Sequence, residues 1–151
     1  MPKITPFLWF DTQAEEAMRF YASVFPNSKL NNVWKGPDGG VMGVNATLDG
    51  QEVRGLNGGP KFKFTEAFSF FVDCRDQAEV DRYWNALTAD GGQESRCGWL
   101  KDKYGLSWQV VPTALGEVLG DKDPARAKRA MEAMLKMSKL DLDAMKRAAN
   151  G

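Results

Sequence analysis

The sequence predicts an α+β fold that consists of two βαβββ modules followed by a C-terminal helical tail. One observation is an internal repeat, because a short apolar strand, an oxygen-bearing residue, Gln-Ala-Glu and an amphipathic helix occur around Thr12 and again around Asp76. Turn-forming glycines then separate alternating segments in both halves, and helix-forming residues dominate the end of the chain. Because a repeat determines the architecture, we expect modules at about 1–60 and 66–112 and a tail at 113–151.

Each module opens with a strand and a helix. The expected strands are Phe7–Phe10 and Phe70–Val72, and each is followed by a candidate N-cap, Thr12 or Asp76, with a Glu three positions later. Such a pair can exchange hydrogen bonds with the backbone of the first helical turn as a capping box. The inner faces of the two helices carry large apolar residues, namely Met18, Phe20, Tyr21 and Phe25, and Val80, Tyr83, Trp84 and Leu87.

Three antiparallel strands follow each helix. Asp49-Gly50 joins two strand-like segments and is typical of a tight hairpin, because glycine readily adopts the positive φ that such a turn needs. The expected strands are 29–34, 41–48 and 51–56 in the first module, and a strand leading to Cys97, 99–100 and 106–111 in the second. Residues 1–112 therefore form one paired βαβββ domain.

Helix-forming residues dominate the tail. We expect helices at 114–119, 125–137 and 141–149, and Asp123-Pro124 is a favourable start for the middle one. The middle helix carries an apolar stripe of Ala127, Ala130, Met131, Met134, Leu135 and Met137. Such a stripe indicates docking on the body of the protein or on a partner subunit rather than on a membrane surface.

Composition and charge exclude several classes of partner. Twenty basic and twenty acidic residues cancel, so we expect neither nucleic acid nor an anionic membrane as a partner. No segment approaches the about 20 apolar residues of a membrane span, and no signal peptide is evident, so we expect a cytoplasmic protein. Cys74 and Cys97 are expected to be free thiols.

The repeat and several local motifs resemble the vicinal-oxygen-chelate superfamily, which includes glyoxalase I, extradiol dioxygenases and bleomycin-resistance proteins. The motifs are Ile4–Phe10, Leu56–Pro60, Phe62–Thr65 and Cys97–Gly105, followed by Ser107-Trp108-Gln109. They are similar to the PhnB-like branch, whose members are often labelled 3-demethylubiquinone-9 3-methyltransferase. The resemblance covers essentially the whole chain and implies a glyoxalase-like fold.

The methyltransferase label is not supported by the glycine pattern. A methyltransferase that uses S-adenosylmethionine usually needs a doubly wound parallel sheet with a Gly-rich loop at a helix N-terminus. Gly39-Gly40 and Gly58-Gly59 both lie between predicted strands, and neither opens a helix. The catalytic residues, and whether the protein is an enzyme at all, stay open.

The resemblance implies a divalent metal held by His and Glu, but the chain has no histidine. The family's ligand positions fall near Thr5 or Pro6, near 67–69 and on Gln109. Neutral hydroxyl and amide oxygens bind transition metals poorly without imidazole or carboxylate partners. Glu52 or Asp73 would face a pocket only in a shifted strand register. We therefore expect no catalytic metal and no other cofactor.

Strand alternation and the resemblance together give candidate ligand-binding residues. Aromatic and polar side chains share the parity of the family's ligand positions, and apolar walls with a few polar groups are typical of small-molecule sites. The candidates are Phe7, Trp9, Asn57, Lys61, Ser69, Phe71, Trp99 and Gln109. Trp108 has the opposite parity to Gln109 and should pack under a helix. Lys61 either orients an anionic ligand or is solvated, and Cys97 lacks the base that a catalytic thiol needs.

Three classes of function remain open. The protein is an uncharacterised glyoxalase-like enzyme with a small-molecule cleft and a lost or rebuilt metal centre, a binding module that sequesters a compound without catalysis, or a structural or regulatory domain with a filled cleft. The missing histidines favour the second class over the first. The resemblance also implies a homodimer, to which we expect the apolar tail to contribute.

Overall fold

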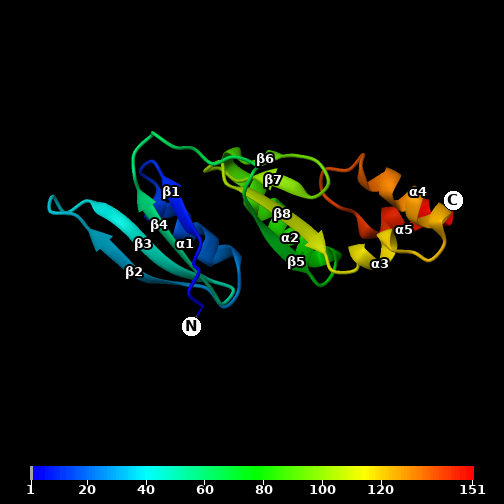
Figure 1. The fold of residues 1–151 in the computed structure, drawn as a ribbon, viewed down its shortest axis with the longest axis horizontal. Helices are drawn as coiled ribbons and strands as arrows, with labels where there is room; N and C mark the ends of the chain where they lie inside the picture. The colour runs from blue at the N-terminus through cyan, green and yellow to red at the C-terminus, as the bar shows by residue number, and fades with distance from the viewer. Residues whose placement is uncertain (1) are drawn as a thin grey trace. The chain divides into compact units, whose positions relative to one another are not determined.

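The computed structural model describes residues 2–151, and the chain forms two compact units that meet in sequence between Phe64 and Thr65. We call them unit 1 and unit 2 and describe each by itself (Figure 1). Unit 1 contains β1 (Phe7–Phe10), α1 (Ala14–Val24), β2 (Lys29–Lys35), β3 (Val41–Leu48) and β4 (Gln51–Asn57). Unit 2 contains β5 (Ser69–Cys74), α2 (Gln77–Thr88), a 3₁₀ turn (Ala89–Gly91), β6 (Gln93–Glu94), β7 (Trp99–Lys101), β8 (Ser107–Pro112), α3 (Leu115–Leu119), α4 (Pro124–Met134) and α5 (Leu142–Asn150).

Both units contain a four-stranded sheet of the same topology. The strand order is β1-β4-β3-β2 in unit 1 and β5-β8-β7-β6 in unit 2. The first and last strands of each βαβββ module pair in parallel, and the other neighbours are antiparallel. The predicted α+β fold with two βαβββ modules and a helical tail is therefore confirmed.

One face of each sheet is covered by the helix of its own unit. In unit 1 the inward side chains of the strands pack against α1, and Gly55 permits a close approach because a Cβ there would lie 3.1 Å from the Met18 side chain. In unit 2, α2 contacts β5, β7 and β8. The buried residues of these two cores are Leu8, Phe10, Ala14, Met18, Tyr21, Val44, Ala46 and Val53, and Cys74, Val80, Tyr83, Trp84, Leu87, Leu100, Trp108 and Val110.

The hairpin of unit 1 lies where its turn residues, Asp49 and Gly50, predicted it. β3 ends at Leu48 and β4 begins at Gln51, as predicted. Asp49 and Gly50 have φ of 48° and 80°, which is the left-handed backbone that a tight hairpin needs. The Asp49 N–H donates to the Ser28 hydroxyl at 2.9 Å, so the turn is also tied to the end of the α1–β2 loop.

The predicted capping box of the first helix is wrong. The N-cap of α1 is Gln13 rather than Thr12, and neither side chain caps the helix. The Ala14 N–H instead donates to Oδ1 of Asn57 at 2.8 Å, so the cap comes from the end of β4. In α2, Asp76 accepts from the Glu79 N–H as predicted, while the Glu79 carboxylate accepts from the N–H of Arg75, one residue before the N-cap.

The tail packs on unit 2 through a buried apolar cluster. Val111 at the end of β8 lies against Leu140 and Met145, both fully buried, and further tail residues surround them. These partly buried neighbours are Leu115, Val118, Met134, Met137 and Leu142. The tail therefore docks on the body of its own chain, which is one of the two partners expected for it.

The middle tail helix ends at Met134, three residues earlier than the predicted Met137. After Met134 the chain continues in tighter turns, in which the N–H groups of Lys136 and Met137 donate to the carbonyls of Ala133 and Met134 at 3.2 and 2.9 Å. The N–H groups of Cys97 and Gly98 donate to the carbonyls of Met137 and Ser138, both at 2.9 Å, so the segment before β7 is bound to the chain that follows α4.

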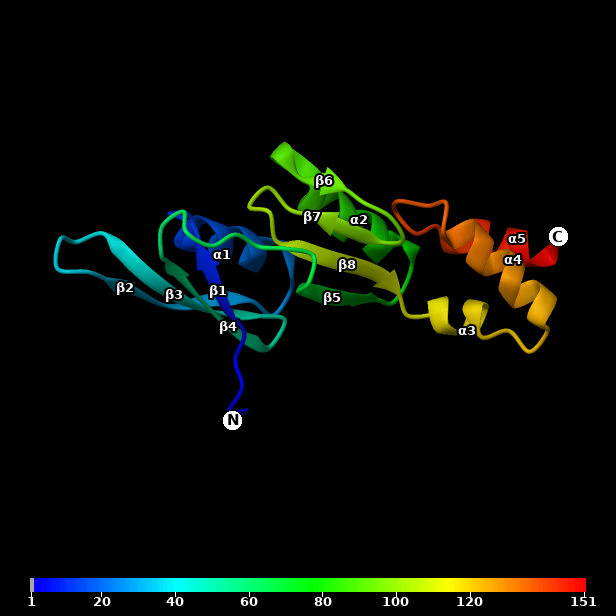
Figure 2. The same ribbon diagram turned by 45° about the horizontal axis from the view of Figure 1, so that its top comes forward.

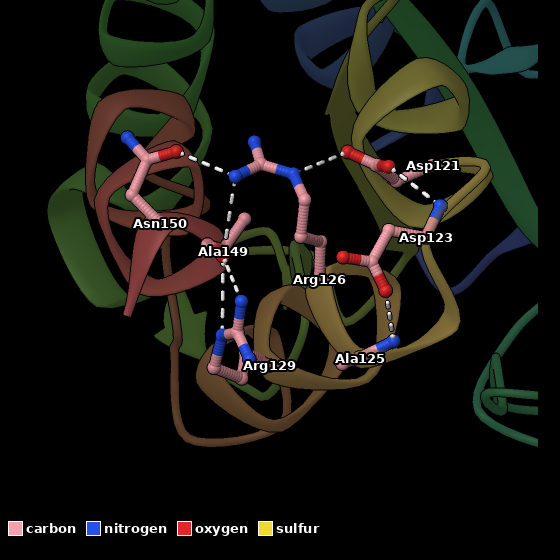
Figure 3. Close-up of polar contacts among 7 residues, drawn as sticks. All are labelled: Asp121, Asp123, Ala125, Arg126, Arg129, Ala149 and Asn150. Carbon is pink, nitrogen blue, oxygen red and sulfur yellow. Dashed lines mark hydrogen bonds and ion pairs between the residues drawn. The ribbon is translucent and has the colours of Figure 1, made fainter.

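Two arginines of α4 bind the end of α5 (Figure 3). Arg129 donates twice to the Ala149 carbonyl, at 3.1 and 2.6 Å, and Arg126 donates to Asn150 Oδ1 at 2.8 Å. Arg126 also forms an ion pair with Asp121 at 2.9 Å. Cations at a helix C-terminus stabilise its unpaired carbonyls, so α4 and α5 are held side by side (Figure 2).

Candidate ligand-binding faces

The side of the unit 2 sheet that faces away from α2 presents polar and aromatic residues. Directly opposed residues of neighbouring strands point to the same side of a sheet. Ser107 is opposite Ser69 and Lys101, and Gln109 is opposite Phe71 and Trp99. We call these six residues the open face of unit 2. It brings together four of the predicted ligand-binding residues, namely Ser69, Phe71, Trp99 and Gln109.

The polar centre of this face contains one unpaired hydroxyl. Gln109 Nε2 donates to Ser69 Oγ at 3.0 Å. Ser107 is only 1% exposed, and within residues 2–151 its Oγ has no hydrogen-bond partner. A buried polar group without a partner costs about 1–3 kcal/mol. The sequence pattern gave Ser107 the right parity but did not reveal that its hydroxyl is unsatisfied.

The charge at the edge of the face is neutralised. Lys101 Nζ forms an ion pair with the Glu66 carboxylate, which comes from the segment before β5. The hydrogen bond from Lys101, with its positive charge, holds the pKa of Glu66 below its usual value. Neither residue was among the sequence candidates, because the pairing joins segments far apart in the chain. The other residues of the face are uncharged.

Trp108 lies on the opposite side of β8, as strand alternation predicts. It is 3% exposed, and its Nε1 donates to Asp102 Oδ2 at 2.8 Å. The same buried carboxylate accepts from the N–H groups of Tyr104 and Leu106 at 2.9 and 3.1 Å. Asp102 therefore fixes the β7–β8 turn and the register of β8, and thereby positions Ser107 and Gln109 on the open face.

The corresponding face of unit 1 also presents aromatic residues. Phe7 and Trp9 of β1 are opposite Arg54 and Leu56 of β4, and we call the side on which they lie the open face of unit 1. Phe7 is 55% exposed, whereas Trp9 is half-buried. Trp9 Nε1 donates to the Gly59 carbonyl at 2.9 Å, and Phe62 packs edge-on against its ring at 4.8 Å. Trp9 thus has structural contacts as well as a place on this face.

Asn45 provides the counterpart of Ser107 in unit 1. It is opposite Arg54 and therefore shares the open face with that residue. Its Oδ1 is buried and has no hydrogen-bond partner in the described part of the chain. Each open face thus contains one buried polar atom without a hydrogen-bond partner among residues 2–151.

Two further predicted site residues, Asn57 and Lys61, have contacts with other groups of unit 1. Asn57 points to the helix-covered side of unit 1, where Oδ1 accepts from Ala14 and Nδ2 donates to the Val41 carbonyl at 3.1 Å. Lys61 is exposed, and its ammonium lies 5.4 Å from the Phe62 ring. A ligand-binding role for Asn57 and Lys61 stays a prediction.

The two cysteines are unpaired, as expected. Cys97 Sγ donates to the Met134 carbonyl at 3.6 Å, so its thiol takes part in tail docking. Burial, followed by the charge of Glu79, raises the pKa of the Cys74 thiol to about 12. Cys74 is therefore a protonated core residue at neutral pH.

The donor set does not fit the superfamily metal. The chain contains no histidine, and in residues 2–151 no three Cys, Asp or Glu side chains converge as a ligand group. Glu52, which would face a pocket only in a shifted strand register, forms an ion pair with Arg54 at 3.2 Å. Gln109 and Ser69 instead bind each other. These residues form a hydrogen-bonding surface rather than a transition-metal site.

Two βαβββ units of the same topology define a protein of the vicinal-oxygen-chelate class. The profile of the family described as 3-demethylubiquinone-9 3-methyltransferase matches residues 2–111. The chain belongs to this family, in its PhnB-like branch. No helix in the described residues is long and apolar enough to cross a membrane.

Solved structures agree with this assignment. The PhnB protein from Bacillus cereus is 34% identical with a TM-score of 0.69, and the match covers 74% of this chain and 100% of that one. Protein PA1353 from Pseudomonas aeruginosa has 18% identity and a TM-score of 0.62, with 74% and 98% coverage, and is similar in fold alone. The fosfomycin resistance protein FosX from Listeria monocytogenes, with 13% identity, a TM-score of 0.50 and 72% and 91% coverage, likewise shares the fold. No curated protein is significantly similar in sequence.

Proposed function

We propose that the protein binds a small organic molecule through the open faces of its sheets and does so without a resident metal ion. The observation that supports this most directly is the pair of buried, unpartnered polar atoms, Ser107 Oγ and Asn45 Oδ1, one on each open face. A face made only to pack against apolar side chains would leave both atoms unsatisfied. A bound polar molecule or ordered water would satisfy them.

Sequestration is favoured over catalysis within this proposal. The residues of the open face of unit 2 include no pair of a nucleophile and a base, since its serines have no histidine or free carboxylate partner. Its one carboxylate neighbour, Glu66, is engaged with Lys101. Methyl transfer, which the family description names, has no support from a cofactor-binding loop, because Gly39-Gly40 and Gly58-Gly59 follow strands and precede no helix.

Two measurements test the proposal. Small molecules that copurify with the untagged protein are extracted and identified by mass spectrometry, and a crystal grown without added ligand is examined for density on the open faces. We expect ordered density beside Ser107. Open faces that are filled by dry side-chain packing would contradict the proposal and favour a structural domain.

The metal is tested separately. We expect elemental analysis of protein purified without a tag to find far less than one equivalent of zinc, nickel or iron. Near-stoichiometric metal, lost together with ligand binding on chelation, would refute the metal-free part of the proposal.

We also propose a homodimer. Met131 of α4 and Leu135, the C-cap of that helix, are exposed, although most other large apolar residues of the tail are buried or partly buried. Closed two-fold pairing is the usual way to cover such exposed apolar residues. Light scattering should give a mass twice the 16.8 kDa of the chain.

A further inference from the structure

We infer that the open face of unit 2 selects an uncharged, planar ligand group that both donates and accepts hydrogen bonds, and that Ser107 is the residue that determines this specificity. The inference rests on the proposed function and adds the chemical class of the ligand. It starts from the Ser107 hydroxyl, which is 1% exposed and unpartnered within residues 2–151. A hydroxyl offers one donor and two acceptor positions, so its partner need not carry charge.

The neighbours of Ser107 extend the same chemistry. Ser69, directly opposite on β5, accepts the Gln109 amide at 3.0 Å. A hydroxyl that accepts one hydrogen bond still carries its own proton as a donor, and the Gln109 carboxamide also has an acceptor oxygen. Ser69, Ser107 and Gln109 therefore offer both donors and acceptors on this face. This pattern is complementary to an amide, or to a carbonyl next to an N–H or O–H group.

The charges on the face disfavour an ionised ligand. Lys101 is the one cation among the six residues, and it is paired with Glu66. An anion or a cation placed against Ser69, Ser107 and Gln109 would be desolvated without a counter-charge, which disfavours binding. An uncharged group avoids this cost.

The aromatic residues favour a planar group. Phe71 and Trp99 are both opposite Gln109, one on each neighbouring strand, so the carboxamide lies between two rings. Because strands in a sheet are about 4.8 Å apart, the two aromatic positions are separated by about 10 Å across the face. Phe71 is 54% exposed and presents its ring to a ligand.

Three isosteric probes separate the charge states: benzamide is neutral at pH 7, benzoate is anionic and benzamidinium is cationic. Each is titrated into the full-length protein, and the backbone and side-chain amide resonances of β5, β7 and β8 are followed by NMR. We expect benzamide to shift these resonances with an affinity about tenfold higher than either charged probe, which is a difference of about 1.4 kcal/mol. Equal or tighter binding of benzoate or benzamidinium at the same strands would overturn the inference.

A variant identifies the role of Ser107. Ser107→Ala should lower the benzamide affinity about tenfold, because one good hydrogen bond is lost. The same variant should unfold at an unchanged or higher urea concentration, since it removes a hydroxyl that has no protein partner. A merely structural serine would give the opposite pattern, with lower stability and unchanged affinity. Ser23→Ala, at an exposed position of α1, is the control and should leave benzamide binding unchanged.

The failure of this inference is distinguishable from that of the proposed function. Binding of a charged probe at β5 and β8 overturns the neutral specificity but leaves small-molecule binding in place. If none of the three probes shifts these strands, the inference is overturned, and the extraction and crystal experiments then decide the proposed function independently. A Ser107→Ala variant that binds benzamide as well as the parent removes Ser107 from the specificity role.

Discussion

Single side chains connect distant segments in this protein, and Asn57 is the clearest example. Its carboxamide bonds the first N–H of α1, 43 residues away, and the Val41 carbonyl, 16 residues away. Thr12 is closer in sequence but does not cap the helix. A capping pattern in the sequence predicts which residues are able to cap, whereas the strand pairing determines which one is in reach.

Asn57→Ala should reduce the free energy of unfolding by about 1–2 kcal/mol, because the variant loses a helix cap and leaves a backbone acceptor with one partner fewer. Urea unfolding followed by circular dichroism measures the change. Asn31→Ala is the matched control, since Asn31 is exposed and bonds only the neighbouring Thr47 hydroxyl; its effect should stay within about 0.5 kcal/mol. Equal effects of the two variants would contradict the role assigned to Asn57.

Gly58→Ala should destabilise unit 1, because a Cβ at this position would lie 2.4 Å from the Trp9 ring. Relief of this overlap requires movement of Trp9 or of the chain, at a cost of about 1–3 kcal/mol. A lower urea midpoint and a shifted tryptophan emission are the expected readouts. By contrast, Gly116→Ala in α3 meets no atom within 4 Å and should raise stability by up to about 1 kcal/mol.

At the scale of elements, predictions that rest on a local sequence signal agree with the structure, whereas contacts between distant segments could not be predicted. The Asp49-Gly50 turn contains its own conformational signal, so β3 and β4 were placed nearly to the residue. The segment after α4 is bound by the N–H groups of Cys97 and Gly98, which lie about 40 residues earlier, and a local pattern does not reveal this pairing. The apolar residues of the tail predicted docking but could not indicate that Val111 is the contact.

Gln77 joins α2 to the tail, and its loss should loosen the tail. Its Nε2 donates to the Leu140 carbonyl at 2.8 Å and its Oε1 accepts from the Leu142 N–H at 2.9 Å. Gln77→Ala removes both bonds and should lower the free energy of unfolding by about 1–3 kcal/mol. Hydrogen exchange should become faster in α4 and α5 before the rest of unit 2. Gln93→Ala, at an exposed position of β6, is the control and should leave this exchange unchanged.

Docking of the tail should also depend on pH. Lys139 pairs with Asp81 at 2.9 Å, and the hydrogen bond from Lys139, with a further one from Gln77, lowers the pKa of Asp81 below its model-compound value of 3.8. A carboxyl with a depressed pKa contributes stability that is present above 3.8 and is lost as the pH falls through the folded-state value.

The stability difference between the parent protein and Asp81→Asn should therefore shrink as the pH falls below 3.8. Urea unfolding at a series of pH values measures this difference. Asp143→Asn provides the control, because this exposed residue of α5 carries the same charge outside the Asp81–Lys139 pair. A difference that stays constant down to the acid transition would exclude the ion pair as the cause.

At the scale of the whole molecule, the sequence predicted which residues share one side of a sheet but not how their polar groups are paired. Strand parity assigned Ser69, Phe71 and Gln109 to one side and Trp108 to the other, as observed. It could not show that Lys101 is neutralised by Glu66 or that the Ser107 hydroxyl is unpaired, because both depend on which segments meet. The sequence also could not show that Asn57, predicted as a ligand-binding residue, accepts from the Ala14 N–H, because that contact joins two distant segments.

The proposed homodimer leads to a test on α4. Leu135 is 55% exposed, and Leu135→Glu should shift the mass seen by light scattering at micromolar concentration toward that of the single chain, because a buried charge disfavours an interface. Ala125→Glu adds the same charge at an exposed position in the first turn of α4 and should leave the mass unchanged. Deleting the tail would be a poor test, since it would also uncover Val111. An unchanged mass for Leu135→Glu would remove α4 from the interface.

The bonds between Gln77 and the tail also constrain the order of events on the ribosome. Leu142 is made 65 residues after Gln77. At a synthesis rate of about 5–20 residues per second, about 3–13 s pass between the synthesis of Gln77 in α2 and that of Leu142. The strands and helix of unit 1 all lie before residue 58, so their synthesis is complete before that of the tail begins. Nascent chains should therefore acquire a protease-resistant first half well before the second half matures.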